Sequence, residues 1–106
     1  MTNAPMNLPT FSLTWAALGT YSTARIKAEL DKMITAEATL LRWRRETIRS
    51  SMDLYGVTPV EVVRADKETG GALEEALEAA RQYTGPIHFL EEEIERRKWA
   101  RRAHVY

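Results

Sequence analysis

The chain has 106 residues with 15 basic and 15 acidic side chains, so its formal net charge is zero, and it contains no cysteine. This length allows one domain with one modest hydrophobic core and excludes two independent domains. The absence of cysteine excludes disulfide bonds, thiolate metal sites and a cysteine nucleophile. A share of 44% hydrophobic and 28% charged residues is typical of an ordinary soluble protein, neither disordered nor membrane-spanning.

Residues 1–20 contain no charged side chain and are predicted to form an N-terminal arm. Pro5 and Pro9 favour extended geometry in the residues before them, so residues 1–11 should be extended. Polar side chains interrupt every apolar run in the arm, which excludes both a secretory signal and a membrane span. We therefore expect a cytoplasmic protein that does not contact membranes.

The arm also carries apolar side chains that something must cover. Either the arm folds back over the helices of its own chain, or it docks on a neighbouring subunit or partner. A single helical turn over residues 15–18, ended by Gly19, is expected at its end. The apolar side chains of the arm are Met6, Leu8, Phe11, Leu13 and Trp15.

A long helix is predicted from about residue 22 to residue 55. Ser22 is a suitable N-cap, and residues 23–55 contain neither glycine nor proline. Such a helix would be about 50 Å long, which exceeds the width of a compact domain of this size. It therefore either kinks near residues 35–39 or is partly covered by another chain, and we favour oligomerisation through this helix.

The apolar residues of the long helix recur at spacings of mostly three, four or seven, which predicts one buried stripe. Leu40 and Trp43 are expected to lie off the centre of this stripe. Its expected members are Ile26, Leu30, Met33, Ile34, Leu41, Ile48, Met52 and Tyr55.

The sequence around Gly56 predicts a sharp boundary between two helices. Gly56 can adopt the left-handed conformation that ends the first helix. Thr58 is then the N-cap of the next helix, with Pro59 at its first position. Val57 and Val62 occupy the two positions of a hydrophobic staple, so several local signals agree.

Three shorter helices are expected after this boundary. The first begins at residue 59 and ends before Gly70-Gly71, the second covers about residues 72–83, and the third follows a break at Thr84-Gly85-Pro86. The predicted fold is therefore all-α, with the arm at residues 1–20 and a single helical domain at residues 21–106.

The sequence contains no pattern that we can assign to catalysis or cofactor binding. The histidines His88 and His104 lack the additional ligands that a zinc site needs. The spacings of zinc hydrolases, serine hydrolases, phosphate-binding loops and dinucleotide-binding folds do not occur. We expect a protein that is not an enzyme and has no metal or cofactor.

The charge of the chain is segmented. Residues 42–49 hold four arginines against one glutamate, residues 96–102 hold five basic residues and no acidic one, and residues 61–78 hold six acidic and two basic residues. Each basic block contains a tryptophan, Trp43 or Trp99, that could stack on a base or a guanidinium. The alternative is that the arginines pair with the acidic segment, within the chain or between chains, and that the tryptophans belong to the core.

Residues 48–65 can also be overlaid on a helix-turn-helix, with Gly56 at the turn. Met52 stands where that motif usually has a small side chain. The same stretch resembles the end of the oligomerisation region of H-NS-like nucleoid proteins, in which a basic helix leads into a Tyr-Gly-hydrophobic-Thr turn. The DNA-binding loop of that family is missing, so the resemblance implies assembly rather than the reading of bases.

Two functions follow from these patterns. We predict a non-catalytic helical assembly or adaptor protein that acts through protein–protein contacts, as an oligomer or as part of a larger complex. The alternative is a DNA-binding regulator that uses the Arg42–Arg49 block, with Arg64 and Lys67 beside the turn. The candidate partner-binding residues are Phe11, Trp15, Arg42, Trp43, Arg44, Arg45, Arg49, Arg97, Trp99 and Arg101.

Overall fold

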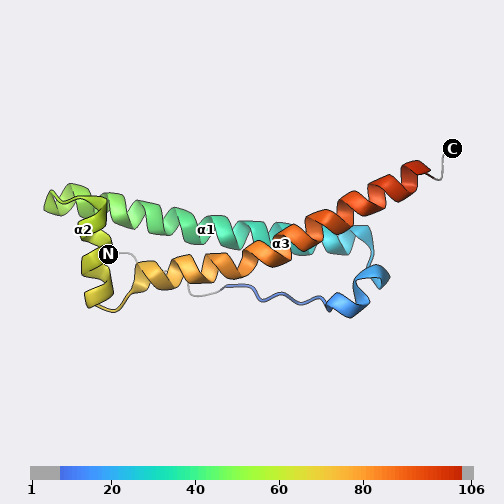
Figure 1. Ribbon diagram of the computed structural model, residues 1–106, viewed down its shortest axis with the longest axis horizontal. Helices are drawn as coiled ribbons and strands as arrows, with labels where there is room; N and C mark the ends of the chain where they lie inside the picture. Colours follow the sequence, from blue (N-terminus) through green and yellow to red (C-terminus); the bar gives the residue numbers. More distant parts are fainter. Residues whose placement is uncertain (1–7, 104–106) are drawn as a thin grey trace.

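The computed structural model describes residues 8–103, and this part of the chain is all-α (Figure 1). It contains the 3-10 helix η1 (Trp15–Thr20) and the α-helices α1 (Thr23–Tyr55), α2 (Pro59–Glu68) and α3 (Ala72–Ala103). The predicted fold class and the predicted long helix are confirmed. Met6 lies outside the described residues.

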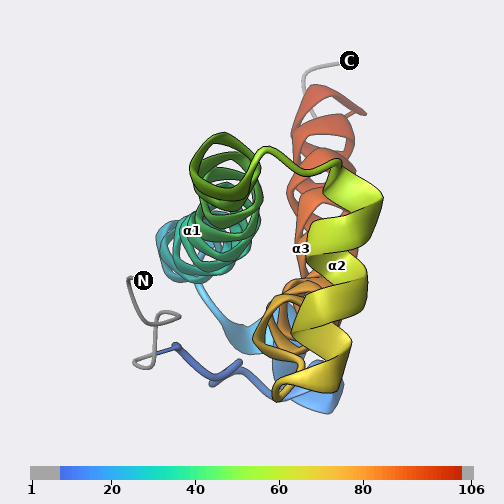
Figure 2. The same ribbon diagram turned by 90° about the vertical axis from the view of Figure 1, so that its left-hand side faces the viewer.

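Helices α1 and α3 form a long antiparallel hairpin, and α2 crosses one end of it (Figures 1 and 2). The molecule measures 63 × 24 × 17 Å, and its radius of gyration is 18.5 Å, whereas a compact domain of this length has about 13 Å. Helix α1 is uninterrupted and shows no sharp bend in Figure 1. It therefore fits without a kink, because the whole molecule is elongated rather than compact.

The helix ends follow the local signals in the sequence. The Ser22 hydroxyl accepts a hydrogen bond from the Arg25 N–H at 3.1 Å, and so caps α1. Gly56 ends α1 in the left-handed conformation, with φ 63° and ψ 38°. The Thr58 hydroxyl accepts from the Glu61 N–H at 3.3 Å at the start of α2. These boundaries are confirmed because each depends on residues within one turn of the helix end.

The break expected at Thr84-Gly85-Pro86 does not form. Helix α3 runs through Pro86 without interruption, so two of the predicted short helices are one helix of 32 residues. Pro86 has no N–H to donate to the carbonyl four residues earlier, which destabilises the helix at this point. Tyr83 and Leu90, on the two sides of Pro86, are both buried against the rest of the protein. We attribute the continuity of α3 to this packing, which outweighs the local preference for a break.

The prediction of a single buried stripe along α1 is wrong. Leu40 is only 1% exposed and lies in the core with Met33, whereas Leu41 and Ile34 are 38% and 41% exposed. One residue along a helix is a rotation of about 100°, so Leu40 and Leu41 point to different sides. The apolar residues of α1 therefore form two stripes, of which one faces α3.

The N-terminal arm, over its described residues, folds back on the helices of its own chain. The Tyr83 hydroxyl donates to the Pro9 carbonyl at 2.7 Å. The N–H and hydroxyl of Ser12 donate to the Glu29 carboxylate at 2.9 and 3.0 Å, and Leu13 is 5% exposed. The helical turn expected at residues 15–18 is longer than predicted, because η1 continues through Gly19 to residue 20.

Candidate functional site

The second apolar stripe of α1 lies outside the hairpin, and we call it the outer stripe. Its seven positions are spaced alternately by four and three residues, the spacing of the a and d positions of a coiled coil. Six of the seven side chains are apolar, and Arg45 is the exception. The outer stripe consists of Ile34, Ala38, Leu41, Arg45, Ile48, Met52 and Tyr55.

Much of the outer stripe is exposed to solvent. Ile34 and Leu41 are about 40% exposed and Tyr55 is 70% exposed, while Ile48 and Met52 are half-buried. The stripe runs for about 31 Å along the helix, given a rise of 1.5 Å per residue. A continuous apolar strip of this kind is typical of a surface that packs against another helix.

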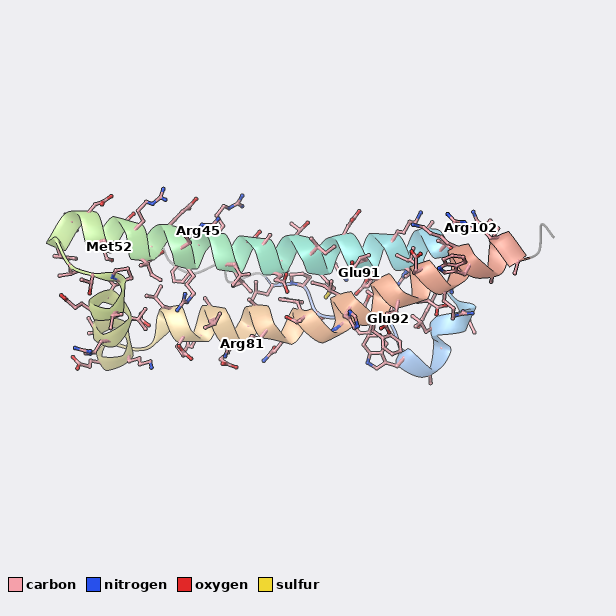
Figure 3. All side chains as sticks on the ribbon, turned by 45° about the horizontal axis from the view of Figure 1, so that its top comes forward. Arg45, Met52, Arg81, Glu91, Glu92 and Arg102 are labelled. Atoms are coloured by element: carbon pink, nitrogen blue, oxygen red, sulfur yellow. The ribbon has the colours of Figure 1, made fainter. Side chains whose placement is uncertain are left out.

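Arginine side chains flank the outer stripe. On one side of the stripe, Arg42 and Arg49 directly follow Leu41 and Ile48, which occupy d positions. On the other side, Arg44 directly precedes Arg45, the central a position. Figure 3 shows Arg45 projecting from the side of α1 that faces away from α3. Arg42, Arg45 and Arg49 make no ion pair or hydrogen bond with any residue in 8–103. Glu46 lies about 100° around the helix from Arg45, away from the stripe.

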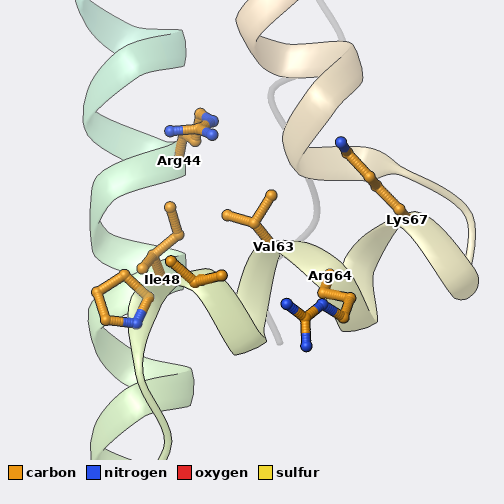
Figure 4. Close-up of a pocket in the computed structure, with 7 residues that line it drawn as sticks. Arg44, Ile48, Val63, Arg64 and Lys67 are labelled. Atoms are coloured by element: carbon orange, nitrogen blue, oxygen red, sulfur yellow. The ribbon is translucent and has the colours of Figure 1, made fainter.

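One end of the outer stripe opens into a groove of about 450 Å³ where α1 meets α2, which we call the corner groove (Figure 4). Its floor is aliphatic, and its rim carries the cations Arg44, Arg64 and Lys67, with no carboxylate among the described residues that line it. Val60 and Leu54 at this corner are 64% and 73% exposed. The residues that line the groove are Arg44, Ile48, Pro59, Val60, Val63, Arg64 and Lys67.

The acidic segment forms no ion pair with these arginines among the described residues, and several of its carboxylates lie at helix starts. The Asp66 carboxylate accepts from the Leu73 N–H at 2.9 Å, ahead of α3. Glu74 and Glu75 lie in the first turn of α3, where the helix dipole favours negative charge. Arg44 instead forms a hydrogen bond to a backbone carbonyl of α3, because its Nε donates to the Leu73 oxygen at 3.3 Å. Within the described residues, the first basic block therefore forms no ion pair with the acidic segment.

The second basic block, in contrast, is largely engaged by its own helix. Glu93 accepts from Arg96 at 2.6 and 2.9 Å and from the Arg97 Nε at 2.9 Å. Arg97 also donates to the Thr23 hydroxyl and to the Leu18 carbonyl, both at 3.1 Å. These bonds connect α3 to the start of α1, so Arg97 is held inside the fold.

The hydrogen bonds from Arg96 and Arg97 hold the pKa of Glu93 at about 2, although burial of the carboxylate acts in the opposite direction. Trp99 is 60% exposed, and the Arg102 guanidinium lies 5.2 Å from the centre of its ring. Arg101 is exposed at the end of α3. These exposed residues lie at the end of the hairpin opposite the corner groove (Figure 1).

The aromatic candidates contact their own chain. Phe11 stacks on Trp15 with ring centres 4.3 Å apart, and Trp15 meets the edge of Phe89 at 4.4 Å. Trp43 packs, half-buried, against the core cluster that contains Met33. These contacts attach the arm to α3 and place Trp43 partly in the core.

The structure thus brings together only part of the predicted set. Arg42, Arg44, Arg45 and Arg49 lie around the outer stripe, whereas the aromatic and C-terminal candidates lie elsewhere. The apolar members of the stripe are not among the predicted binding residues. The alternating spacing of four and three from Ile34 onward is the signal in the sequence that distinguishes them.

No protein-family model, curated protein or solved structure matches this chain. In the part of the chain that the structure covers, no helix is both long enough and apolar enough to cross a membrane. The same residues contain no group of three His, Asp or Glu side chains that could hold a metal ion.

Proposed function

We propose that the protein is a non-catalytic helical assembly or adaptor protein that binds other proteins along the outer stripe. The observation that carries this proposal is the alternating spacing of exposed apolar residues on α1. The arm covers one side of the hairpin with Leu8, Phe11 and Leu13. The outer stripe has no such cover from the described residues over its exposed positions Ile34, Ala38, Leu41 and Arg45. A helix from another chain would fill this place as the third helix of a bundle.

The surface area of the chain supports the same proposal. The accessible surface is 7660 Å², while a compact monomer of 12.1 kDa has about 6,000 Å². The larger surface agrees with the elongated shape of the molecule, which measures 63 × 24 × 17 Å. A partner on the outer stripe would bury apolar surface that this chain leaves in water.

A labelled synthetic helix of three heptads tests this proposal. The probe has leucine at d, alanine at a and glutamine at the flanking positions, and its binding is followed by fluorescence anisotropy. We expect the probe to bind the native chain and to lose at least about tenfold in affinity with Leu41→Asp, because the charge would be buried in the contact. Ser50→Asp is the matched control, since Ser50 is exposed and lies half a turn around α1 from Leu41.

The outcomes of this experiment separate the possibilities. Equal binding to the native chain, Leu41→Asp and Ser50→Asp would place the contact elsewhere and contradict the proposal. A monomer in light scattering that also fails to bind the probe would contradict it as well.

The alternative function, DNA binding, is favoured by the three unpaired arginines Arg42, Arg45 and Arg49 on α1. Their spacing of three and four places them on one side of the helix, where they could contact phosphates. A shift of duplex DNA at about 50 mM salt that is lost with Arg45→Ala and Arg49→Ala would support this function over protein binding.

A further inference from the structure

We propose that the partner of the outer stripe is an amphipathic helix with acidic flanks, supplied by a different protein. This inference rests on the proposed function and names the chemistry of the partner. Its apolar side chains would pack on the stripe, and its carboxylates would meet the surrounding cations. Three kinds of observation support it: the charge along the stripe, the charge of the corner groove and the position of Arg45.

The flanks of the outer stripe are basic over its central part. Arg42, Arg44 and Arg49 occupy flanking positions, which in coiled coils set the choice of partner through their charges. Glu37 is the acidic residue at these positions, and it already accepts a hydrogen bond from the Thr84 hydroxyl at 3.4 Å. The charge that the partner meets is therefore mainly positive, and arginine forms strong paired hydrogen bonds with carboxylates.

The corner groove continues this charge at the end of the stripe. Arg64 and Lys67 project from α2, and Figure 4 shows them on the same helix as Val63, with Ile48 on α1 completing the aliphatic floor. Neither cation has an ion pair or hydrogen bond among the described residues. A partner helix that lies along the stripe and reaches the groove would meet both aliphatic side chains and cations. These match the apolar face and the acidic flanks of an acidic amphipathic helix.

A second copy of the chain fits this surface less well. Arg45 is the central position of the stripe, so a symmetric antiparallel pair with matched ends places two Arg45 side chains together. The same pairing brings two arginine blocks, residues 42–49, into one interface. Like charges at such positions disfavour association, and a carboxylate opposite Arg45 would instead form an ion pair.

Nucleic acid also fits less well, because the surface between the cations is mainly aliphatic, and the exposed ring of the outer stripe, Tyr55, lies at its end, beyond Arg49. Ile48, Val60 and Val63 offer no ring on which a base could stack, and Trp43 is half-buried against the core. The apolar face of a helix matches these side chains, so the observations favour a protein partner.

Three synthetic helices of identical a and d residues test the inference. They carry glutamate, glutamine or lysine at all flanking positions, and each is titrated into the full chain at about 50 mM and about 500 mM salt. We expect the glutamate helix to bind at least about tenfold more tightly than the glutamine helix at low salt, and the lysine helix to bind least. The advantage of the glutamate helix should shrink at high salt.

The double variant Arg42→Gln with Arg49→Gln identifies the cations responsible. Both side chains are exposed and unpaired in the described structure, so the fold should be retained. We expect the variant to remove most of the preference for glutamate and to leave binding of the glutamine helix unchanged. Arg101→Gln, at the far end of α3, is the control and should change neither.

Each result decides between specific alternatives. If the glutamate and glutamine helices bind equally and both depend on Leu41, the inference of an acidic partner is wrong and the proposed function stands. If no helix binds, both this inference and the proposed function are wrong. If a duplex DNA of about 20 base pairs displaces the glutamate helix and binds more tightly, the surface is a nucleic-acid interface. If light scattering shows a dimer that excludes the glutamate helix, the partner is a second copy.

Discussion

At the scale of single residues, Glu93 shows how one carboxylate can connect three helical elements. It is 8% exposed and receives hydrogen bonds from Arg96 and Arg97, and Arg97 extends the connection to η1 and α1. Its pKa of about 2 lies below the ordinary value of 4.5. A depressed pKa stabilises the fold above pH 4.5, and this contribution is lost as the pH falls toward 2.

We expect Glu93→Gln to lower the free energy of unfolding by about 2–3 kcal/mol at pH 7, because it leaves two guanidinium groups without their carboxylate. The difference from the native chain should decrease steadily between pH 4.5 and pH 2, as carboxylates in the unfolded chain become protonated. Urea unfolding followed by circular dichroism at several pH values measures both effects.

Glu95→Gln is the control for this experiment. Glu95 and Lys98 are exposed and 3.9 Å apart, so the change should cost less than about 1 kcal/mol. A Glu93→Gln variant that is destabilised equally at pH 7 and pH 2 would show that packing, rather than ionisation, explains its effect.

Ser12 and Glu29 attach the arm to α1. Burial alone would raise the pKa of Glu29, but the hydrogen bonds from Ser12 and the ammonium of Lys32, 3.0 Å away, leave it below its ordinary value. We expect Ser12→Ala to cost about 1 kcal/mol, since it removes the hydroxyl donor and keeps the backbone one. Urea unfolding measures this cost, and Ser50→Ala on the exposed side of α1 should change stability by less than about 0.5 kcal/mol. Equal stability of the two variants would contradict a role for the Ser12 hydroxyl.

At the scale of helices, the ends of α1 and α2 could be predicted from sequence and the continuity of α3 could not. The caps at Ser22 and Thr58 and the turn at Gly56 depend on side chains within one turn, so local rules suffice. We attribute the path of the chain through Pro86 instead to the packing of Tyr83, whose hydroxyl donates to Pro9 of the arm, a partner 74 residues away in the sequence. Local rules contain no information about such a distant contact.

Two glycines separate these effects experimentally. Gly85 lies within α3 with helical backbone angles, and an added Cβ would meet nothing within 4 Å. Gly85→Ala should therefore stabilise the protein by about 0.5–1 kcal/mol. Gly56→Ala should instead destabilise it by about 1 kcal/mol, because φ at this position is 63°. Thermal unfolding of both variants checks the opposite signs, and a destabilised Gly85→Ala would indicate that α3 is not helical at this point.

The outer stripe could be predicted only in part for a related reason. A helix whose apolar residues span a wide face can present them as one stripe or two, depending on what packs against it. Leu40 and Leu41 are both suitable for a core, and only the position of α3 decides that Leu40 is buried. The arginines at 42–49 were identifiable from charge alone and the helix period places them beside Leu41, whereas the exposure of Ile34 and Leu41 follows from the packing of the hairpin.

At the scale of the whole molecule, the net charge of zero conceals two ends of different character. The arginines around the outer stripe and corner groove form no ion pair within residues 8–103, while Arg96 and Arg97 at the other end are held by Glu93. The hairpin separates these regions along the longest axis of the molecule, which measures 63 Å. Association along the stripe therefore depends on how its basic centre is compensated, which makes Arg45 the decisive position.

We expect Arg45→Leu to convert the chain into one that self-associates. The change completes the alternating apolar pattern and removes the charge that opposes pairing of two copies, and each buried leucine contributes about 1.5–3 kcal/mol. The association constant should rise at least about tenfold, measured as an increase in mass by light scattering over a concentration series. Arg101→Leu adds the same side chain outside the stripe and should leave the mass unchanged. If both variants keep the mass of the native chain, the outer stripe does not pair with itself even when fully apolar, whereas equal association of both would indicate nonspecific contact.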